Sequence, residues 1–553
     1  MALATAQTAI RSNFGQNIFG YCYRFGRELN NRIRKYGVAF IIGIRRALKM
    51  LLFVDGKPMK VPAKMTSTGP MTRRQFAGRT LMTAGAIAGA PAFLRGQNLN
   101  NKLNIAFIAC GGRANASLDE LTIAPGRTSS RIRKSETIAS PGPHPDENVT
   151  VLCDINQMAL DSASQRYPKA KKFTDFRRVF DQPNDFDAVV VSTAEHTHAF
   201  ATYLALTNGK HVYCEKPLAY NIWETRLIRE TAAKYPKLST QMGNQGHAFD
   251  ARRTLREILN RGVIGPVREV HVWADRAWGL QDAASAEKFD KPHGFYKGIQ
   301  IVERFKEKMT IPSTLDWDLW LGPAPERPFH ETYFPGPRWY RWWDFGNGTM
   351  SDLGSHDNDV PFTVLDLWRP DGKGGRVLAP LTVESISSNV PVAHPELAPA
   401  TLQATFQFAA VGGQPPLKLV WHQGDSKPPG WVESWGKRSC IFIGEKGMLL
   451  GTGKLLPEER FQDFKLPPET LPRSPGHWVE WVNYAKGNGP VPNSNFKYSG
   501  WTTETNHLGN VAYRTGKKLE WDYRTMRASN APAADPFIKR PEYRKGWEGI
   551  LKA

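Results

Sequence analysis

Short apolar runs recur through the first half of the chain, and stretches with helical spacing separate them. These runs occupy residues 102–108, 149–154, 187–193 and 211–214. Apolar runs of this length predict buried strands, and strands that alternate with helices predict a doubly wound parallel sheet. We therefore predict an α/β domain over residues 98–245.

The pattern changes in the second half of the chain. Residues 267–273 alternate between apolar and polar positions, which predicts a strand with one buried face. Residues 401–408 and 439–443 predict further strands of the same kind of sheet. A helical run then extends to about Lys518. These features predict a second α/β domain over residues 246–518.

The remaining stretches lack a regular pattern. Residues 519–553 are rich in proline and charge, and we predict that they form a C-terminal tail. Residues 121–148 are rich in Ser, Pro, Gly and Arg, and residues 280–312 or so are mainly polar. Both stretches predict surface insertions.

The N-terminal residues have two parts. Residues 1–70 are basic and weakly patterned, and we predict a disordered extension. Residues 71–95 contain Arg73-Arg74-Gln75-Phe76 followed by small apolar residues, which resembles a twin-arginine export signal. A short core helix that begins with two arginines is the alternative. We expect a periplasmic or otherwise exported protein, and a cytoplasmic one if the signal is not used.

The formal net charge of +21 is concentrated at the N-terminus. Residues 1–95 hold 16 Lys and Arg against two acidic residues, whereas the rest of the chain holds 57 against 50. The body therefore lacks the electrostatic footprint of a nucleic-acid-binding protein, and no nucleic-acid partner is expected. No run of 18 apolar residues occurs, so we expect no stable membrane insertion of the mature protein.

A glycine turn follows the first strand. Its sequence is Ala109-Cys110-Gly111-Gly112-Arg113-Ala114, in which alanine replaces the first and third glycines of a dinucleotide-binding GxGxxG turn. The motif alone is weak, and a plain strand-turn-helix is an equal alternative. The second strand ends in Asp154, where an acid would accept hydrogen bonds from ribose hydroxyls and repel a 2′-phosphate. This favours NAD over NADP.

Polar residues also follow the next two strands. Ser192 and Thr193 end one of them, and His196 and His198 follow. Two histidines two positions apart with no third ligand do not predict a metal site, so the loop is expected to border the cofactor or to cap the next helix. The next strand runs into Glu215-Lys216-Pro217. The proline restricts the backbone of Lys216, so the lysine side chain is expected to have a fixed direction.

A polar helical pattern occupies residues 346–359. Asp352, His356 and Asp359 are spaced by four and three positions, which places them on one helical face. A solvated polar face is the alternative. Ahead of this pattern, aromatic residues are concentrated between 317 and 345, and most are expected to pack in the core. One or two at a cleft rim, such as Trp343, would stack on a sugar, which favours a carbohydrate-like small-molecule substrate.

From about residue 102 to its C-terminus, the chain resembles the Gfo/Idh/MocA family of NAD(P)-dependent oxidoreductases. The residues that carry the resemblance are Gly111-Gly112, Asp154, the strand end 191–193, Glu215-Lys216-Pro217, and the run 241–245 that resembles the secreted bacterial branch. The resemblance implies an N-terminal Rossmann dinucleotide-binding domain and a C-terminal α/β domain with a large, open, mostly antiparallel sheet. It also implies a substrate cleft between them and a possible homodimer or homotetramer.

The resemblance further implies site residues. The family places a catalytic Asp and His four residues apart, and Asp352 and His356 match this pattern. His356 would act as the base towards a substrate hydroxyl, Lys216 would bind the same oxygen, and Asp352 would orient His356 or bind a neighbouring hydroxyl. Asp359 and Trp343 are further substrate candidates. The cofactor candidates are Gly111, Gly112, Arg113, Asp154, Ser192, Thr193, His196, Glu215, Lys216 and Asn244.

Two other functions remain open at this point. Some exported relatives are glycosidases that oxidise a sugar transiently with bound NAD, although they carry a Thr-His-Gly-type segment where this chain has Asp352–His356. A catalytically silent protein that holds the cofactor is the other alternative, because the glycine turn is altered.

Overall fold

The computed structural model describes residues 53–54, 57–58, 102–123, 145–280, 307–334 and 337–552. The chain divides into two units, Met1–Gln97 and Asn98–Ala553. Of the first unit, the description covers two short antiparallel strands, β1 (Phe53–Val54) and β2 (Lys57–Pro58). The export signal predicted at 71–95 lies outside the described residues, as do most of the two predicted insertions.

The second unit begins with a parallel sheet of six strands in the order β5-β4-β3-β6-β7-β8. Its central strands are fully buried apolar runs, which need helices on both faces of the sheet. The strands are β3 (Asn104–Ile108), β4 (Asn148–Cys153), β5 (Lys171–Phe173), β6 (Ala188–Val191), β7 (His211–Cys214) and β8 (Thr240–Met242). The helices between them are α5 (Ala114–Leu121), α6 (Gln157–Arg166), α7 (Phe176–Val179), α8 (Glu195–Thr207) and α9 (Ile222–Lys234). This confirms the predicted doubly wound fold, and the order reverses direction at β3.

Local sequence determines where several of these helices begin. Asn156 caps α6 by accepting a hydrogen bond from the Met158 amide, and Asn221 caps α9 by accepting one from the Glu224 amide. Asn221 in turn donates from its side chain to Glu224 at 2.8 Å, so both ends of this cap are satisfied. The strand ends that precede these caps are thereby held in place.

The larger sheet has nine strands in the order β17-β16-β15-β9-β14-β13-β12-β18-β19. Neighbouring strands are antiparallel except β9 and β14, which are parallel. The predicted large and mostly antiparallel sheet is confirmed. Its strands are β9 (Val267–Ala274), β12 (Thr382–Ile386), β13 (Leu402–Phe408), β14 (Leu417–Gln423), β15 (Arg438–Gly444), β16 (Met448–Leu450), β17 (Leu455–Leu456), β18 (Leu519–Asp522) and β19 (Arg527–Ala528).

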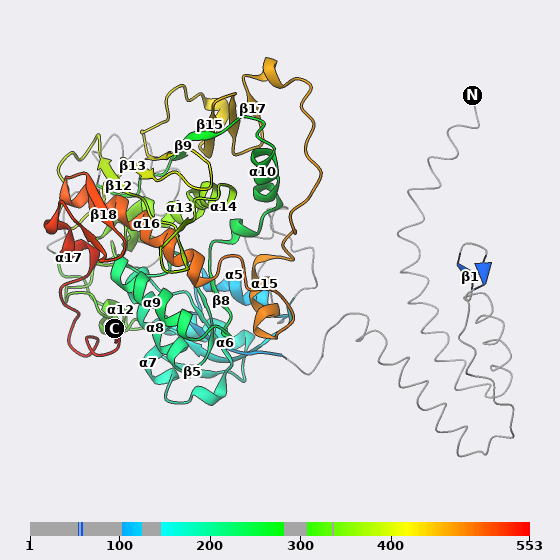
Figure 1. Cartoon of the computed structure of the whole chain (residues 1–553). Coiled ribbons are helices and arrows are strands. Elements are labelled where there is room, and N and C mark those ends of the chain that lie inside the picture. The colour runs from blue at the N-terminus through cyan, green and yellow to red at the C-terminus, as the bar shows by residue number, and fades with distance from the viewer. Residues whose placement is uncertain are drawn as a thin grey trace, which may run out of the picture. The chain divides into compact units, whose positions relative to one another are not determined.

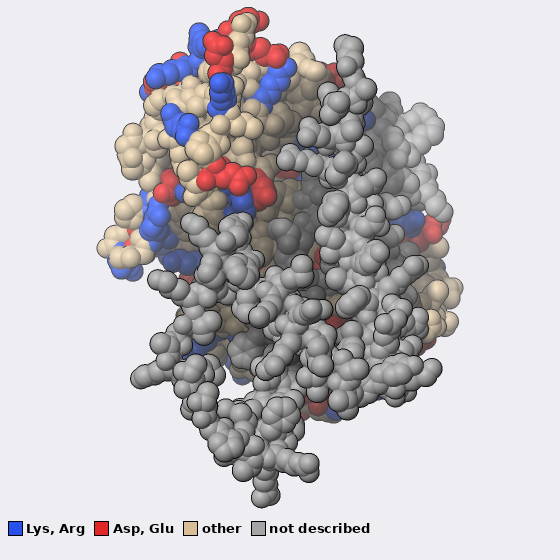
Figure 2. Space-filling model, turned by 90° about the vertical axis from the view of Figure 1, so that its right-hand side faces the viewer, with Lys and Arg blue, Asp and Glu red and all other residues tan. Residues whose placement is uncertain are grey.

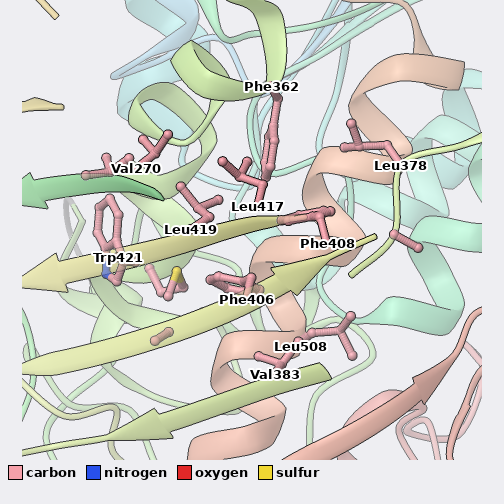
Figure 3. Packing of buried hydrophobic residues seen from close by; sticks show 14 of the residues in the cluster. Val270, Phe362, Leu378, Val383, Phe406, Phe408, Leu417, Leu419, Trp421 and Leu508 are labelled. Atoms are coloured by element: carbon pink, nitrogen blue, oxygen red, sulfur yellow. The ribbon is translucent and has the colours of Figure 1, made fainter. Parts of the chain in front are cut away.

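One face of the large sheet packs against helices, and the main core lies between them (Figure 3). Leu417, Leu419 and Trp421 alternate along β14 and point to this face, as the period of a strand requires. Phe362 points towards Leu417 from the helical layer, and Leu508 of the same layer lies beside Val383 of β12. The helices of this layer are α10 (Asp250–Asn260), α13 (Gly348–Asp357), α14 (Asp359–Val364) and α16 (Phe496–Thr515).

The C-terminal part of the chain returns to the first domain (Figure 1). Helix α16 packs on α9 as well as on β12, and α15 (His477–Ala485) packs on α5. Trp478 of α15 stacks on Tyr213 of β7, with ring centroids 6.2 Å apart. The two domains therefore share their helical cover and are joined by more than a single linker.

The tail predicted over residues 519–553 is wrong. These residues supply β18 and β19 of the large sheet, and Trp547 packs edge-on against Phe200 of α8 at 5.5 Å. The two strands are only four and two residues long, and charged residues lie within and between them, which hid their alternation in the sequence.

On the face shown in Figure 2, basic and acidic side chains are mixed over the described surface. None of the helices in the described ranges is long and apolar enough to cross a membrane.

Candidate active site

The glycine turn between β3 and α5 has a left-handed backbone at two positions. Ala109 has φ 64° and Gly112 has φ 51°. Ala109 therefore adopts a conformation that favours glycine, which explains why the dinucleotide motif usually has glycine there. A Cβ atom added to Gly112 would meet no atom within 4 Å, so this turn faces open space. The backbone can accordingly approach a ligand at the start of α5.

Asp154 closes this turn from the end of β4. Its two carboxylate oxygens accept hydrogen bonds from the Cys110 and Asn156 amides, each at 2.9 Å. Burial raises its pKa, and these amide donors oppose that shift. Asp154 thus holds the glycine turn in place. Its contact with a ribose stays a prediction.

Glu215 connects the turn to the end of β7. Its Oε1 accepts hydrogen bonds from Arg113 Nε at 3.0 Å and from Gln245 Nε2 at 3.2 Å. A Cβ on Gly243 would lie 2.6 Å from the Glu215 carboxylate, so only glycine fits at that position. The structure thereby brings Arg113 and Glu215, two predicted cofactor residues, into one ion pair.

Three buried polar atoms at consecutive strand ends have no hydrogen-bond partner within the described part of the chain. They are Ser192 Oγ after β6, Glu215 Oε2 after β7 and Asn244 Nδ2 after β8. Buried polar groups are normally paired, so unpaired ones along one sheet edge indicate groups that bind a ligand. Together with the open turn at Gly112, they fit a dinucleotide along the carboxyl ends of the strands.

Lys216 lies at the centre of the site. Its ammonium group forms an ion pair with Asp352 Oδ1 and lies 3.1 Å from Tyr340 Oη. Burial alone would lower the pKa of Lys216, but Asp352 and Tyr340 outweigh it and raise this pKa above its ordinary value. The lysine is therefore a permanent cation. The peptide bond between Lys216 and Pro217 is cis.

His198 holds the loop that carries Lys216. Its Nδ1 lies 2.7 Å from the Pro217 carbonyl oxygen and its Nε2 lies 3.0 Å from that of Thr193. It joins the ends of β6 and β7, so its role is to position the lysine. The sequence offered only the pair of histidines as a signal for this contact.

Asp352 comes from α13 and bridges two cations. Besides the contact with Lys216, its Oδ2 accepts a hydrogen bond from Arg276 Nη1 at 2.6 Å. Burial opposes its ionisation, but Lys216 and Arg276 outweigh burial and hold its pKa below the ordinary value. Asp352 is accordingly an anion whose two oxygens are both occupied.

His356 lies one helical turn beyond Asp352, as the sequence predicted. Burial, followed by the positive charges of Lys216 and Arg438, lowers its pKa well below the ordinary value. The imidazole is therefore neutral at neutral pH and can accept a proton. Its own carbonyl oxygen accepts a hydrogen bond from Arg252 Nη2 at 2.9 Å, which fixes the end of α13.

Glu195 is a site residue that sequence reasoning missed. It is fully buried in the first turn of α8, where Asn347 Nδ2 and Ser351 Oγ lie 3.2 and 3.4 Å from its Oε2. Burial raises its pKa to about 8, so it is protonated at neutral pH. The available signal in the sequence was its place a few residues beyond the apolar run that forms β6.

Other predicted residues lie away from Lys216. His196 Nε2 lies 2.9 Å from the Trp320 carbonyl oxygen, inside an aromatic cluster, so it anchors packing. Thr193 accepts a hydrogen bond from Thr197 at 2.8 Å. Asn244 accepts one from Ser494.

The two substrate candidates are also placed elsewhere. Asp359 opens a separate helix, α14, because α13 ends at Asp357, so the single helical face predicted for 352, 356 and 359 is wrong. Asp359 binds Arg252 and accepts a hydrogen bond from Tyr498 at 2.6 Å. Trp343 is 2% exposed in the main core, so it lines no cleft. Tyr340, from the same aromatic stretch, is the residue that reaches Lys216.

A cavity of about 620 Å³ opens beside the carboxyl ends of β4 and β5. Ile155 and Thr174, just beyond the ends of these strands, line one side, and Asp316 and Arg327 line another. The cavity lies next to Asp154. In the strand order it is separated from Lys216, which follows β7, by β3 and β6.

Comparisons with known proteins match both domains. Residues 129–243 match the oxidoreductase family domain described as an NAD-binding Rossmann fold, Gfo/Idh/MocA. Residues 289–366 match the C-terminal alpha/beta domain of the same family. The first match includes Asp154 and Lys216, and the second includes Asp352 and His356.

Individual relatives are more distant. An inositol 2-dehydrogenase of Salmonella typhimurium is 28% identical over 124 residues, which are 22% of this chain and 37% of the relative. A levoglucosan dehydrogenase of Pseudarthrobacter phenanthrenivorans is 30% identical over 122 residues, or 21% and 30% of the two chains. The match thus spans about a third of the length of these relatives.

Among solved structures, the WlbA dehydrogenase of Bordetella pertussis, in complex with NADH and UDP-GlcNAcA, is 14% identical with a TM-score of 0.48. That comparison covers 76% of this chain and 99% of the other. The matched ranges, 129–243 and 289–366, are thus similar to the NAD-binding domain and to the C-terminal domain of one family, Gfo/Idh/MocA.

Proposed function

We propose that the protein is an NAD-dependent oxidoreductase that transfers a hydride between the nicotinamide and a hydroxyl-bearing carbon of a sugar or cyclic polyol. The observation that carries the proposal is the convergence of a permanently charged lysine, a paired carboxylate and a neutral histidine. Lys216, Asp352 and His356 come together from two domains at the carboxyl edge of the parallel sheet. Asp154, held by the Cys110 amide, and Glu215, held by Arg113, lie where the cofactor is expected to bind.

Bound NAD supplies the hydride acceptor in this chemistry. Lys216 donates a hydrogen bond to the substrate oxygen and stabilises the negative charge that develops there, because its raised pKa keeps it charged. Asp352 holds the ammonium group in place. His356 accepts the hydroxyl proton, since its lowered pKa leaves the imidazole unprotonated before the reaction.

The preference for NAD rests on Asp154. A carboxylate at this strand end repels a 2′-phosphate, and its fixed position against the Cys110 amide prevents it from turning away. Replacing Asp154 by Ser should raise the affinity for NADP relative to NAD in a direct binding titration. An unchanged ratio of the two affinities would contradict this role.

The substrate class is supported by the names of the relatives. Inositol and levoglucosan, after which two of the relatives are named, are both polyhydroxylated ring compounds. Tyr340 beside Lys216 adds an aromatic face of the kind that packs on sugar rings.

The direct experiment has two steps. The purified protein is denatured and the released nucleotide identified, and the native protein is then screened with NAD and a panel of sugars and cyclic polyols for nicotinamide reduction. We expect NAD(H) binding and reduction by at least one ring polyol. Hydrolysis of a simple glycoside without net nicotinamide reduction would identify the glycosidase chemistry, and failure to bind NAD(H) would reject both enzymes.

We further propose export through the twin-arginine pathway. The support is the sequence Arg73-Arg74-Gln75-Phe76 with its small apolar continuation. Fractionation of cells that express the full chain should find the protein outside the cytoplasm. Changing both arginines to lysine should retain it inside, and an unchanged distribution would reject the proposal.

A further inference from the structure

Arg276 follows β9 and borders the site opposite Lys216. Its Nη1 donates to Asp352 Oδ2 at 2.6 Å, and its guanidinium lies over the Trp278 ring at 3.9 Å. The side chain is 28% exposed, and Asp352 is its one hydrogen-bonding partner among the described residues. The guanidinium is therefore held rigidly by an anion and a ring, while its other donors remain available.

The charges around this arginine do not cancel. Lys216 and Arg276 share the single carboxylate of Asp352. Glu195 and His356 are both uncharged at neutral pH, for the reasons given above. Within the described part of the chain, this group of residues therefore has one positive charge in excess.

The neighbouring charges are already paired and do not supply the missing anion. Asp357 binds Arg438 with an oxygen-to-nitrogen distance of 2.6 Å, and Asp275, next to Arg276 in sequence, binds Lys427. Glu215 is engaged with Arg113 at 3.0 Å. The excess positive charge of the Lys216, Asp352 and Arg276 group is thus not neutralised by these neighbours, and it lies where the substrate is expected to bind.

An oxidised nicotinamide ring is itself a cation, so a neutral substrate would leave two positive charges close together in a partly buried site. A carboxylate on the substrate would neutralise one of them and accept two parallel hydrogen bonds from a guanidinium. We propose that Arg276 binds the carboxylate of a sugar acid, so that the substrate class is a carboxylated sugar. This inference rests on the proposed function and narrows its substrate.

The test compares a carboxylated and a neutral form of one sugar. The ratio of kcat/KM for glucuronate to kcat/KM for glucose, and the same ratio for the galactose pair, are measured with NAD for the wild type and for Arg276→Gln. Hydrogen bonds to charged groups are worth about 1.5–3 kcal/mol, so the ratio should fall by about 10- to 100-fold in Arg276→Gln. A general loss of activity affects both substrates and leaves the ratio unchanged.

Two further variants complete the design. Arg276→Lys keeps the charge but loses the paired donors, so it should retain part of the preference for the acid. Arg268→Gln makes the same charge change at the other end of β9, where Arg268 is exposed and paired with Glu445. It should leave the ratio at the wild-type value. A fall in this control equal to that of Arg276→Gln would overturn a specific role for Arg276.

The outcomes separate this inference from the proposed function. Reduction of NAD by neutral polyols with no preference for the acid would overturn the inference and leave the proposed function standing. A preference for the acid that survives Arg276→Gln would also overturn it. Binding of NAD without reduction by any sugar, cyclic polyol or sugar acid of the wider panel would reject the proposed function itself.

Discussion

Lys216 and Asp352 form a buried ion pair although 136 positions separate them in the chain. Lys216 belongs to the Rossmann domain and Asp352 to the helical layer on the large sheet, so the pair joins the two domains across the site. Removing one member of a buried pair leaves an uncompensated charge, which is costly. The same contact therefore serves the proposed chemistry and fixes the relative position of the two domains.

The pH dependence of activity should reflect the lowered pKa of His356. A histidine whose pKa is depressed stays unprotonated below pH 6.5 or so, its ordinary value. The acid limb of the kcat profile should therefore lie below pH 6.5, and His356→Asn should lose about 100-fold or more in kcat. Steady-state kinetics over a pH series checks both points. An acid limb above pH 6.5 would contradict a neutral base.

Glu195 should make stability depend on pH. Its folded pKa of about 8 lies above its unfolded value near 4.5, so the folded state holds its proton more tightly. The stability this provides is complete below pH 4.5 or so and is lost as pH rises towards 8. The free energy of unfolding of Glu195→Gln should thus rise relative to that of the wild type as pH rises, by about 1.4 kcal/mol per pH unit at most.

Chemical unfolding between pH 5 and 8.5 measures this gain. Glu257→Gln is the matched control, because Arg473 lowers the pKa of Glu257 to about 2 and the difference from wild type should then be constant in this range. A constant difference for Glu195→Gln as well would show that Glu195 is ionised in the folded protein.

Ala109→Gly should stabilise the protein. A left-handed backbone costs an alanine about 1–2 kcal/mol, and the greater freedom of glycine in the unfolded chain offsets about half of this. The net gain in the free energy of unfolding should be about 0.5–1 kcal/mol. Ala233→Gly makes the same change on the exposed side of helix α9, and it should lower the free energy of unfolding by about the same amount. Destabilisation by both variants would contradict the positive φ at Ala109.

Residues 519–553 should prove essential to the fold. A chain that ends at Lys518 loses β18, and it also loses Trp547 from the core around α8. We expect it to be insoluble or unfolded. The milder Trp547→Ala should cost about 3–5 kcal/mol in chemical unfolding, whereas Leu466→Ala, at a side chain 67% exposed, should cost little. A truncated chain of wild-type stability would restore the predicted tail.

The sequence predicted those parts of the fold that local patterns encode. The apolar run at 211–214 became β7 with the same bounds, and the spacing of Asp352 and His356 placed them one turn apart on α13. The prediction for Asp359 failed because Pro361 has no amide hydrogen to donate to the Asp357 carbonyl, so a new helix begins after Asn358 and the regular spacing is interrupted. The prediction for Trp343 failed because the sequence does not distinguish an aromatic residue that lines a cleft from one that is buried in a core.

Contacts between distant segments were beyond the reach of the sequence. Arg276 and Tyr340 approach Lys216 only because the large sheet and the aromatic segment fold over the Rossmann edge. Glu195 gains its raised pKa from burial, which depends on the complete tertiary structure. No motif encodes either effect.

The most direct test of the account is the reduction of NAD by a ring polyol or sugar acid in Lys216→Met compared with wild type. Nicotinamide absorbance reports the reaction, and a nucleotide-binding titration reports whether the cofactor site survives. We predict that the wild type reduces NAD and that Lys216→Met still binds NAD but is slower by about 100-fold or more. An equal rate in the two proteins would contradict it, because Lys216 would then contribute nothing to the hydride transfer.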